Sequence, residues 1–204
     1  MAAATESSIS TPRELSGDKA ARIVEAMRTS VAARGISGST FDHVANEAGV
    51  SRGLLHYYFG SKERLLVEVV RRESDVRIDR LEEAIVGAAD AEDVLAALVR
   101  SFEEWVGDGP APVMIYEMLT LAQRNDEIAA QLAELGRRVR SHLAAALEGK
   151  QDTGVLSLRI EPELVAMFLL ALADGVMVRR LSEPEIDIGP LTEQAIIAAR
   201  AVLS

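Results

Sequence analysis

The chain has 204 residues, 49% of them hydrophobic, so it is long enough for one or two small domains with a substantial core. It contains no cysteine, which excludes disulfides, zinc–thiolate sites and thiol nucleophiles. The formal net charge is −10, but residues 10–64 carry eight Lys/Arg against six Asp/Glu, so the acidic total does not exclude a nucleic-acid-binding segment near the N-terminus.

Residues 1–15 are rich in Ala, Ser and Thr, and this composition predicts a disordered arm. Arg13 in this arm could enter a minor groove, or the arm could be a free tail. No apolar leader is present, and the longest apolar run, Leu164–Ala173, is too short to span a bilayer. The sequence therefore predicts a cytoplasmic protein without a membrane partner.

The first predicted helix covers residues 18–34, with a start at Ser16 or Asp18 and an end at Gly35. Its apolar residues recur at steps of three and four, which places them on one buried face: Ala20, Ile23, Val24, Met27 and Val31. Two short helices follow and cannot bury enough apolar surface alone. We therefore expect this helix to support them.

The next two predicted helices are joined by a tight turn within residues 40–62. Thr40 and Ser51 are suitable N-caps, and Gly49 stands where a helix ends in a left-handed residue. The first helix has one apolar face, formed by Phe41, Val44, Ala45 and Ala48. The second is expected to bury Leu54, Leu55 and Tyr58. A small residue, a gap of four and a glycine are typical of a DNA-binding helix-turn-helix.

The outer face of the second short helix is unusual for a solvated surface, because it combines Arg52, His56 and Tyr57 beside the small Gly53. Arginine can donate two hydrogen bonds to guanine, and imidazole and phenol groups can contact bases or phosphates. The residues also allow other interpretations. The pair of helices could be an ordinary packed hairpin, His56 a surface histidine, and Tyr58 a core residue.

The rest of the chain also has helical periodicity, and no strand pattern or repeat competes with it. Ser61 begins a long helix that runs to about residue 86. Glycine and proline at 107–112, a loop at 149–158 and prolines at 184 and 190 separate the later segments, with Pro162 at a first helical position. These segments are residues 91–106, 113–123, 126–148, 162–181 and 191–203. The predicted fold is all-α, with about nine helices.

The block from residue 40 to 62 resembles the signature of the tetracycline-repressor (TetR) family. The resemblance covers about residues 18–66, and His56 stands where the family often has Tyr. It is carried by Thr40, Val44-Ala45, Ala48-Gly49-Val50-Ser51, Gly53, Leu55, Tyr58-Phe59 and Ser61-Lys62. The resemblance implies a ligand-responsive transcriptional regulator, commonly a repressor, that binds a palindromic DNA operator as a dimer. It divides the chain into an arm (1–15), a three-helix helix-turn-helix domain (16–62) and a helical ligand-binding and dimerisation domain (63–204).

In this interpretation eight residues contact DNA. Arg52 would bind guanine, and His56 and Tyr57 would touch bases or phosphates, with Gly53 leaving room beside them. Four more would hold the phosphate backbone, namely Thr40, Ser51, Tyr58 and Lys62.

The C-terminal part is expected to hold a small, apolar effector. Bulky or pliable side chains there could line a cavity or form ordinary core: Phe102, Trp105, Met114, Tyr116, Met118, Met167, Phe168 and Met177. The helix 162–181 is apolar nearly all round through Ala173, so it needs cover on several sides. We expect a homodimer through helices 162–181 and 191–203. A monomer with one buried central helix is the alternative.

An enzyme is the first competing class. The only histidines are His43, His56 and His142, and none pairs with a carboxylate or another histidine at metal-ligand spacing. No glycine-rich phosphate loop or nucleophile elbow is present. The sequence therefore predicts no catalytic site, metal or cofactor. The second competing class is a helical small-molecule-binding or interaction module whose helix-turn-helix no longer functions.

Overall fold

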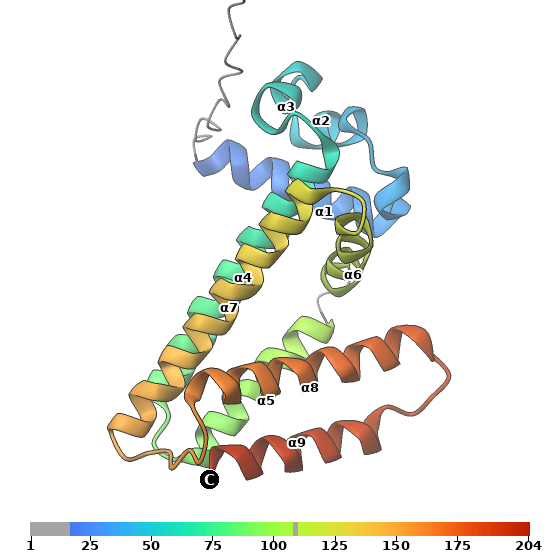
Figure 1. Cartoon of the computed structure of the whole chain (residues 1–204). Coiled ribbons are helices and arrows are strands. Elements are labelled where there is room, and N and C mark those ends of the chain that lie inside the picture. Colours follow the sequence, from blue (N-terminus) through green and yellow to red (C-terminus); the bar gives the residue numbers. More distant parts are fainter. Residues whose placement is uncertain (1–16, 108–109) are drawn as a thin grey trace, which may run out of the picture. The chain divides into compact units, whose positions relative to one another are not determined.

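The computed structural model describes residues 17–107 and 110–204, so the predicted arm at 1–15 lies outside the described residues. Within these ranges every regular element is a helix, from α1 to α9 (Figure 1), which confirms the all-α fold class. The chain divides into two compact units, with the border between Glu68 and Val69. The first turns of α4 thus belong to the N-terminal unit, whereas the sequence predicted a border at residue 62.

The N-terminal unit contains α1 (Gly17–Gly38), α2 (Phe41–Ala48), α3 (Arg52–Phe59) and the start of α4 (Lys62–Gly87). The predicted end of the first helix at Gly35 is a kink, where the backbone has φ 70° and ψ 171° before one more helical turn. Glycine adopts this positive φ without the steric cost of a Cβ. After the kink, Ser39 Oγ donates to the Gly35 carbonyl at 2.9 Å and accepts from buried Ser30 Oγ at 3.0 Å.

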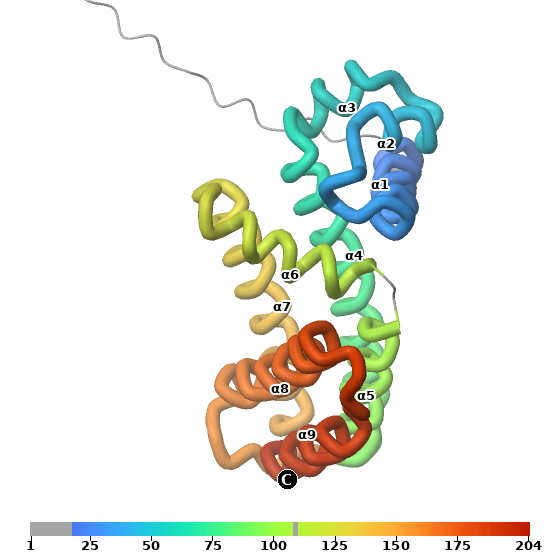
Figure 2. The backbone as a smooth tube through the Cα atoms, turned by 90° about the vertical axis from the view of Figure 1, so that its right-hand side faces the viewer, coloured from blue at the N-terminus to red at the C-terminus, as the bar shows by residue number. Residues whose placement is uncertain are grey.

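The C-terminal unit contains the rest of α4 and five further helices, which are shown as a tube in Figure 2. They are α5 (Ala91–Gly107), α6 (Ala111–Ala122), α7 (Asp126–Asp152), α8 (Pro162–Ser182) and α9 (Gly189–Leu203). Pro162 is the first residue of α8, as predicted, because a proline there lacks only an N–H that the helix leaves unpaired. The same reason places Pro190 inside the first turn of α9 rather than in the predicted linker.

The end of α7 differs from the expected end at residue 148. The helix continues through Gly149 to Asp152, and the chain reverses at Gly154, which has φ 75°. Lys150 lies in this added turn, where its Nζ donates to the carbonyls of Val86 and Ala88 at 2.7 Å each. These bonds use carbonyls at the end of α4 that have no partner within the helix. The glycine that stops the helix is therefore Gly154, and Gly149 is tolerated inside it.

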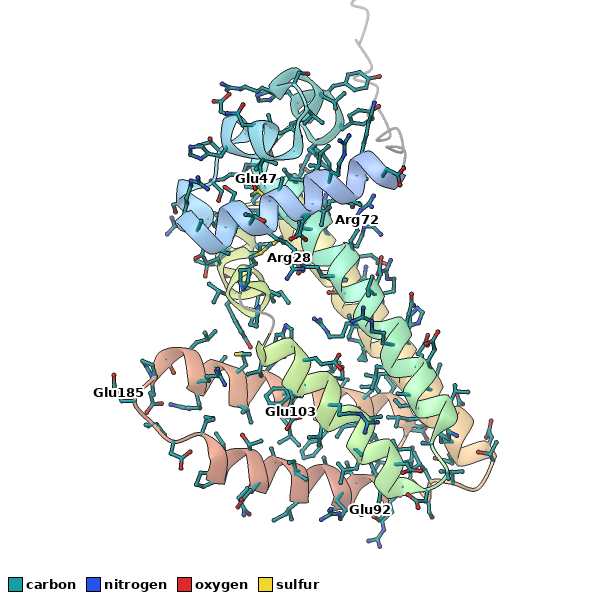
Figure 3. All side chains as sticks on the ribbon, turned by 180° about the vertical axis from the view of Figure 1, so that it is seen from behind. Arg28, Glu47, Arg72, Glu92, Glu103 and Glu185 are labelled. Carbon is teal, nitrogen blue, oxygen red and sulfur yellow. The ribbon has the colours of Figure 1, made fainter. Side chains whose placement is uncertain are left out.

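The core of the C-terminal unit is formed by α5, α7, α8 and α9 together with the end of α4. α8 contacts both α7 and α9, and α5 contacts α9. At the outer surface Arg200 on α9 forms a two-pronged ion pair with Glu92 on α5, labelled in Figure 3, at 2.8 and 3.0 Å. The most deeply buried residues of this core are Ile85, Val94, Leu147, Val165, Ala166 and Leu203.

α8 is only partly covered by the helices of its own unit. Its inner side is buried through Val165, Ala166 and Leu169, but a second apolar side remains open to solvent. α9 has open apolar residues as well. The exposed large apolar side chains of these two helices are Leu164, Met167, Phe168, Val178, Leu181, Leu191 and Ile197. The expectation that α8 needs cover beyond its own unit is consistent with this exposure.

Candidate DNA-reading face and ligand cavity

The turn between α2 and α3 follows from its sequence. Thr40 Oγ1 accepts from the His43 amide at 3.3 Å, and Ser51 Oγ accepts from the Leu54 amide at 3.2 Å, so both predicted N-caps are confirmed. Gly49 is left-handed, with φ 64° and ψ 39°. The Val50 amide bonds the Ala45 carbonyl at 2.9 Å and the Gly49 amide bonds the Asn46 carbonyl at 3.4 Å. This pair of bonds is a Schellman motif, which satisfies the last carbonyls of α2.

α3 has one buried side and one exposed side. Leu55 is fully buried and Phe59 nearly so, whereas Leu54 and Tyr58 are only half-buried. The sequence had placed Leu54 and Tyr58 in the core. Residues four apart share a helix face, so burial of Leu55 selects Phe59 as its companion and turns Leu54 and Tyr58 to the flanks. The predicted outward face is confirmed as exposed: Arg52, Gly53, His56 and Tyr57.

Arg52 is held by two neighbours on this exposed face. Its Nη1 lies 3.3 and 3.0 Å from the two carboxylate oxygens of Asp42, in the first turn of α2. Its Nε donates to His56 Nε2 at 3.3 Å. The His56 ring in turn packs edge-on against Phe41, with ring centroids 4.7 Å apart. Sequence reasoning had identified Arg52 and His56 but not Asp42, because nothing in the spacing of residues 42 and 52 shows that they meet.

Lys62 has a structural partner. Its Nζ donates to the Ile36 carbonyl at 2.9 Å and is half-buried, which ties the start of α4 to the turn after the Gly35 kink. A lysine ammonium has two further N–H groups, so this bond leaves the predicted phosphate contact possible.

The C-terminal unit contains a cavity of about 470 Å³ that is partly open to solvent. Its wall is formed by parts of α4, α5, α6, α7, α8 and α9, and most of the lining is apolar. α7 contributes a stripe of residues at helical spacing that were not among the predicted pocket residues, namely Leu132, Leu135, Val139 and Leu143. The volume is in the range of pockets that hold small organic ligands.

The predicted pocket residues divide into two groups. Phe102, Trp105 and Tyr116 line the cavity. The other five do not: Met114, Met118 and Met177 are buried in packing, and Met167 and Phe168 are exposed on α8. The sequence left each of these residues open between cavity wall and ordinary core, because residue type alone does not decide between them. Which face of a helix borders the cavity depends on how the helices pack together.

Several polar groups lie in the cavity wall. The Tyr116 hydroxyl donates to the Asp174 backbone carbonyl at 3.4 Å. Burial first, and then the nearby Asp174 carboxylate, raises the pKa of Tyr116 to about 12, so it is a neutral phenol donor at neutral pH. Burial also raises the pKa of Asp174 above its usual value. The remaining charged residues of the wall are Arg77, Glu82 and Glu103, of which Glu103 is labelled on α5 in Figure 3.

Trp105 is the most unusual of these groups. Its ring lies 6.2 Å from that of Phe102, and the Arg77 guanidinium is 5.6 Å from the Trp105 ring centroid. The indole Nε1–H is buried, yet it has no hydrogen-bond acceptor among the described residues. Buried donors are nearly always paired in native proteins, so this N–H is a candidate donor to a ligand in the cavity.

Residues 17–107 and 110–204 contain neither a cluster of metal-ligating side chains nor a membrane-spanning helix. No group of three or more His, Cys, Asp or Glu side chains there is placed to hold a metal ion. No helix in the same ranges is both long and apolar enough to cross a membrane.

Each of the two units matches a model of a known protein family. Residues 23–69 match the family model "Bacterial regulatory proteins, tetR family", and residues 91–203 match "BetI-type transcriptional repressor, C-terminal". The chain is 32% identical over 162 residues to the HTH-type transcriptional regulator BetI of Rhizobium meliloti, covering 78% of this chain and 75% of that protein. The chain belongs to the TetR family of transcriptional regulators. Its C-terminal unit is of the BetI type.

Solved structures of transcriptional regulators have the same fold. A putative TetR-family regulator from Rhodococcus sp. superposes with a TM-score of 0.74 at 28% identity, over 93% of this chain and all of that one. A putative regulator from Saccharomonospora viridis, solved in complex with choline, has a TM-score of 0.68 at 23% identity, over 88% and 94% of the two chains. The first family model spans α1 to the start of α4, and the second spans α5 to α9.

Proposed function

We propose that this TetR-family regulator acts in the cytoplasm as a repressor, which binds a palindromic operator as a homodimer and is released by a small ligand. The observation that carries the proposal is the outer face of α3. Arg52, His56 and Tyr57 are exposed there, on a helix fixed by the Ser51 cap at one end and by buried Leu55 and Phe59 beneath. A short, firmly seated helix with donors on its open side fits a major groove.

Within this proposal the two caps also serve the phosphates. The side-chain oxygens of Thr40 and Ser51 accept hydrogen bonds from helix amides. Each hydroxyl hydrogen therefore remains able to donate to a phosphate. Phosphate contacts of this kind, together with Tyr58 and Lys62, set the register of α3, while Arg52 and its neighbours read bases. The two α3 helices of a dimer would lie about 34–36 Å apart, one turn of DNA.

The dimer is proposed to form through α8 and α9. Along α8, Leu164, Phe168, Ala171, Gly175 and Val178 are exposed and recur at steps of three and four, so they share one face. The small Ala171 and Gly175 at its centre would allow two helices to approach closely. A contiguous apolar surface of this kind marks an interaction site in a soluble protein.

The dimer interface can be tested with Phe168→Arg, because the side chain is 39% exposed and its loss leaves the core intact. Val86→Arg on α4, where the side chain is 71% exposed, is the matched control. Sedimentation at micromolar concentration should show the wild type and the control as dimers and Phe168→Arg as the 22.0 kDa monomer. A wild-type monomer would refute this part of the proposal.

The ligand is proposed to bind in the cavity of the C-terminal unit. The wall is largely apolar, which favours a ligand with an apolar surface, and the unpaired indole N–H of Trp105 favours one that also offers an acceptor. Three carboxylates against one guanidinium disfavour an organic anion. The choline complex of the S. viridis protein makes a small organic cation a second class to try.

Release from DNA would be a shift between two conformations. A ligand that weakens DNA binding roughly 100-fold must favour the non-binding conformation by about 2.7 kcal/mol. α4 begins at Lys62 in the N-terminal unit, and its later residues Arg77, Ile78 and Leu81 line the cavity. A ligand there therefore contacts the same helix that starts beside the reading face, and this connection supports α4 as the coupling element.

The test is selection of bound duplexes from a random DNA pool, repeated with 1-decanol and with choline as probes. We expect a palindrome whose half-site centres lie about one helical turn apart. Trp105 is the only tryptophan and lines the cavity, so its fluorescence reports probe binding in the same sample. No sequence preference would favour the alternative of a helical binding module without a working reader. A probe that changes the fluorescence but never the operator affinity would refute the switch.

A further inference from the structure

We propose that Asp42 sets the sequence specificity of the reading face by fixing the orientation of Arg52, a positioning role that rests on the proposed function. Asp42 lies in the first turn of α2, and Arg52 is the first residue of α3. Their ion pair, with a shortest distance of 3.0 Å, links the two helices at their N-terminal ends. Nothing in the family resemblance includes residue 42.

The ion pair between Asp42 and Arg52 contributes little to the stability of the folded protein. The Arg52 and Asp42 side chains are 59% and 60% exposed. Exposed pairs of this kind contribute about 0–1 kcal/mol, because water competes for both charges and two long side chains must be ordered. The larger effect of the pair is therefore on where the guanidinium points.

The bonds to Asp42 and His56 leave one edge of the Arg52 guanidinium for recognition of a base. Asp42 takes Nη1, and His56 Nε2 takes the Nε hydrogen, which holds both sides of the guanidinium. Nη1 donates to both Asp42 oxygens, whereas Nη2 has no hydrogen bond among the described residues, so the terminal edge that Nη2 forms with Nη1 is the edge proposed to meet a base. Two parallel donors of this kind match the O6 and N7 acceptors of guanine.

Fixing the Arg52 side chain before DNA binding increases discrimination between the operator and random DNA. A mobile arginine loses rotamer freedom when it binds, at a cost of about 0.5–1.5 kcal/mol, whereas one already held by Asp42 and His56 has lost it in the free protein. A mobile arginine can also turn to a phosphate at any sequence. Asp42 competes with such phosphate contacts, and its own negative charge repels phosphates when the contact to guanine is absent. Both effects lower random binding relative to operator binding.

The decisive experiment compares three variants for their affinities for the selected operator and for random duplex at one salt concentration. Asp42→Asn should lower the operator-to-random ratio by roughly 2- to 10-fold, the range that corresponds to the ordering cost of one side chain, and should raise affinity for random DNA. Asp42→Glu keeps the charge but displaces the carboxylate, so it should lower the ratio without raising random affinity.

Glu47→Gln is the matched control. Glu47 is an exposed acid on the same helix, labelled in Figure 3, and no ion pair to it occurs within the described residues. Its removal changes the charge by the same amount, so it should raise both affinities together and leave the ratio unchanged. If Asp42→Asn behaves like Glu47→Gln, the charge alone matters and the positioning role is refuted.

An Arg52→Ala background supplies the second control. There, Asp42→Asn should no longer change the operator-to-random ratio, since the side chain that it positions is gone. A ratio that still falls in the Arg52→Ala background would overturn the proposal. The proposal would also be overturned if Asp42→Asn alone raised the operator affinity more than the random affinity, because Asp42 would then hinder the contact of Arg52 with DNA. These outcomes differ from failure of the proposed function, in which the wild type itself shows no preference for any sequence.

Discussion

Gly49 offers a direct test of how the turn holds the reading helix. Its φ of 64° and ψ of 39° lie in the left-handed region, where a Cβ costs about 1–2 kcal/mol. A Cβ built at this position meets no atom within 4 Å, so no steric clash adds to that cost. Gly49→Ala should therefore destabilise the N-terminal unit by about 1–2 kcal/mol through backbone conformation alone.

Hydrogen exchange measures this effect where it arises. A loss of about 1–2 kcal/mol corresponds to roughly 5- to 30-fold faster amide exchange in peptides from α2 and α3, if these helices open as one unit. Peptides from α8 and α9, in the other unit, should keep their rates. Gly49→Asn is the matched control, because asparagine adopts left-handed backbone more readily than alanine. Equal acceleration by Ala and Asn, or none by Ala, would refute the reasoning.

Three further outcomes are expected. Leu147→Ala removes a fully buried side chain from the core of the C-terminal unit and should cost about 2–5 kcal/mol in denaturant unfolding followed by Trp105 fluorescence. Ser51→Ala removes the cap on α3 and should cost about 1 kcal/mol, measured as faster hydrogen exchange in α3. Lys62→Met should reduce the slope of log affinity against log salt by about 1 on operator and random DNA alike. An unchanged slope would make the bond to the Ile36 carbonyl the whole role of Lys62.

The sequence by itself determined several local features of both units. The caps at Thr40 and Ser51, the left-handed Gly49 and the start of α8 at Pro162 each depend on one residue and its immediate neighbours in the chain. Such features follow from backbone geometry and from hydrogen bonds over three or four residues, which a sequence displays directly. The exposed face of α3 follows from the same periodicity, once Leu55 is taken as its buried side.

Only the tertiary structure decided which distant residues meet. It brought Asp42 to Arg52, placed the Lys62 ammonium on the Ile36 carbonyl, and left Met167 and Phe168 on the surface instead of in the cavity wall. Helical periodicity shows that a residue lies on an apolar face, but a core, a cavity and a partner surface all require such faces. The packing of one helix against another chooses among them, and that packing depends on side chains far apart in the sequence.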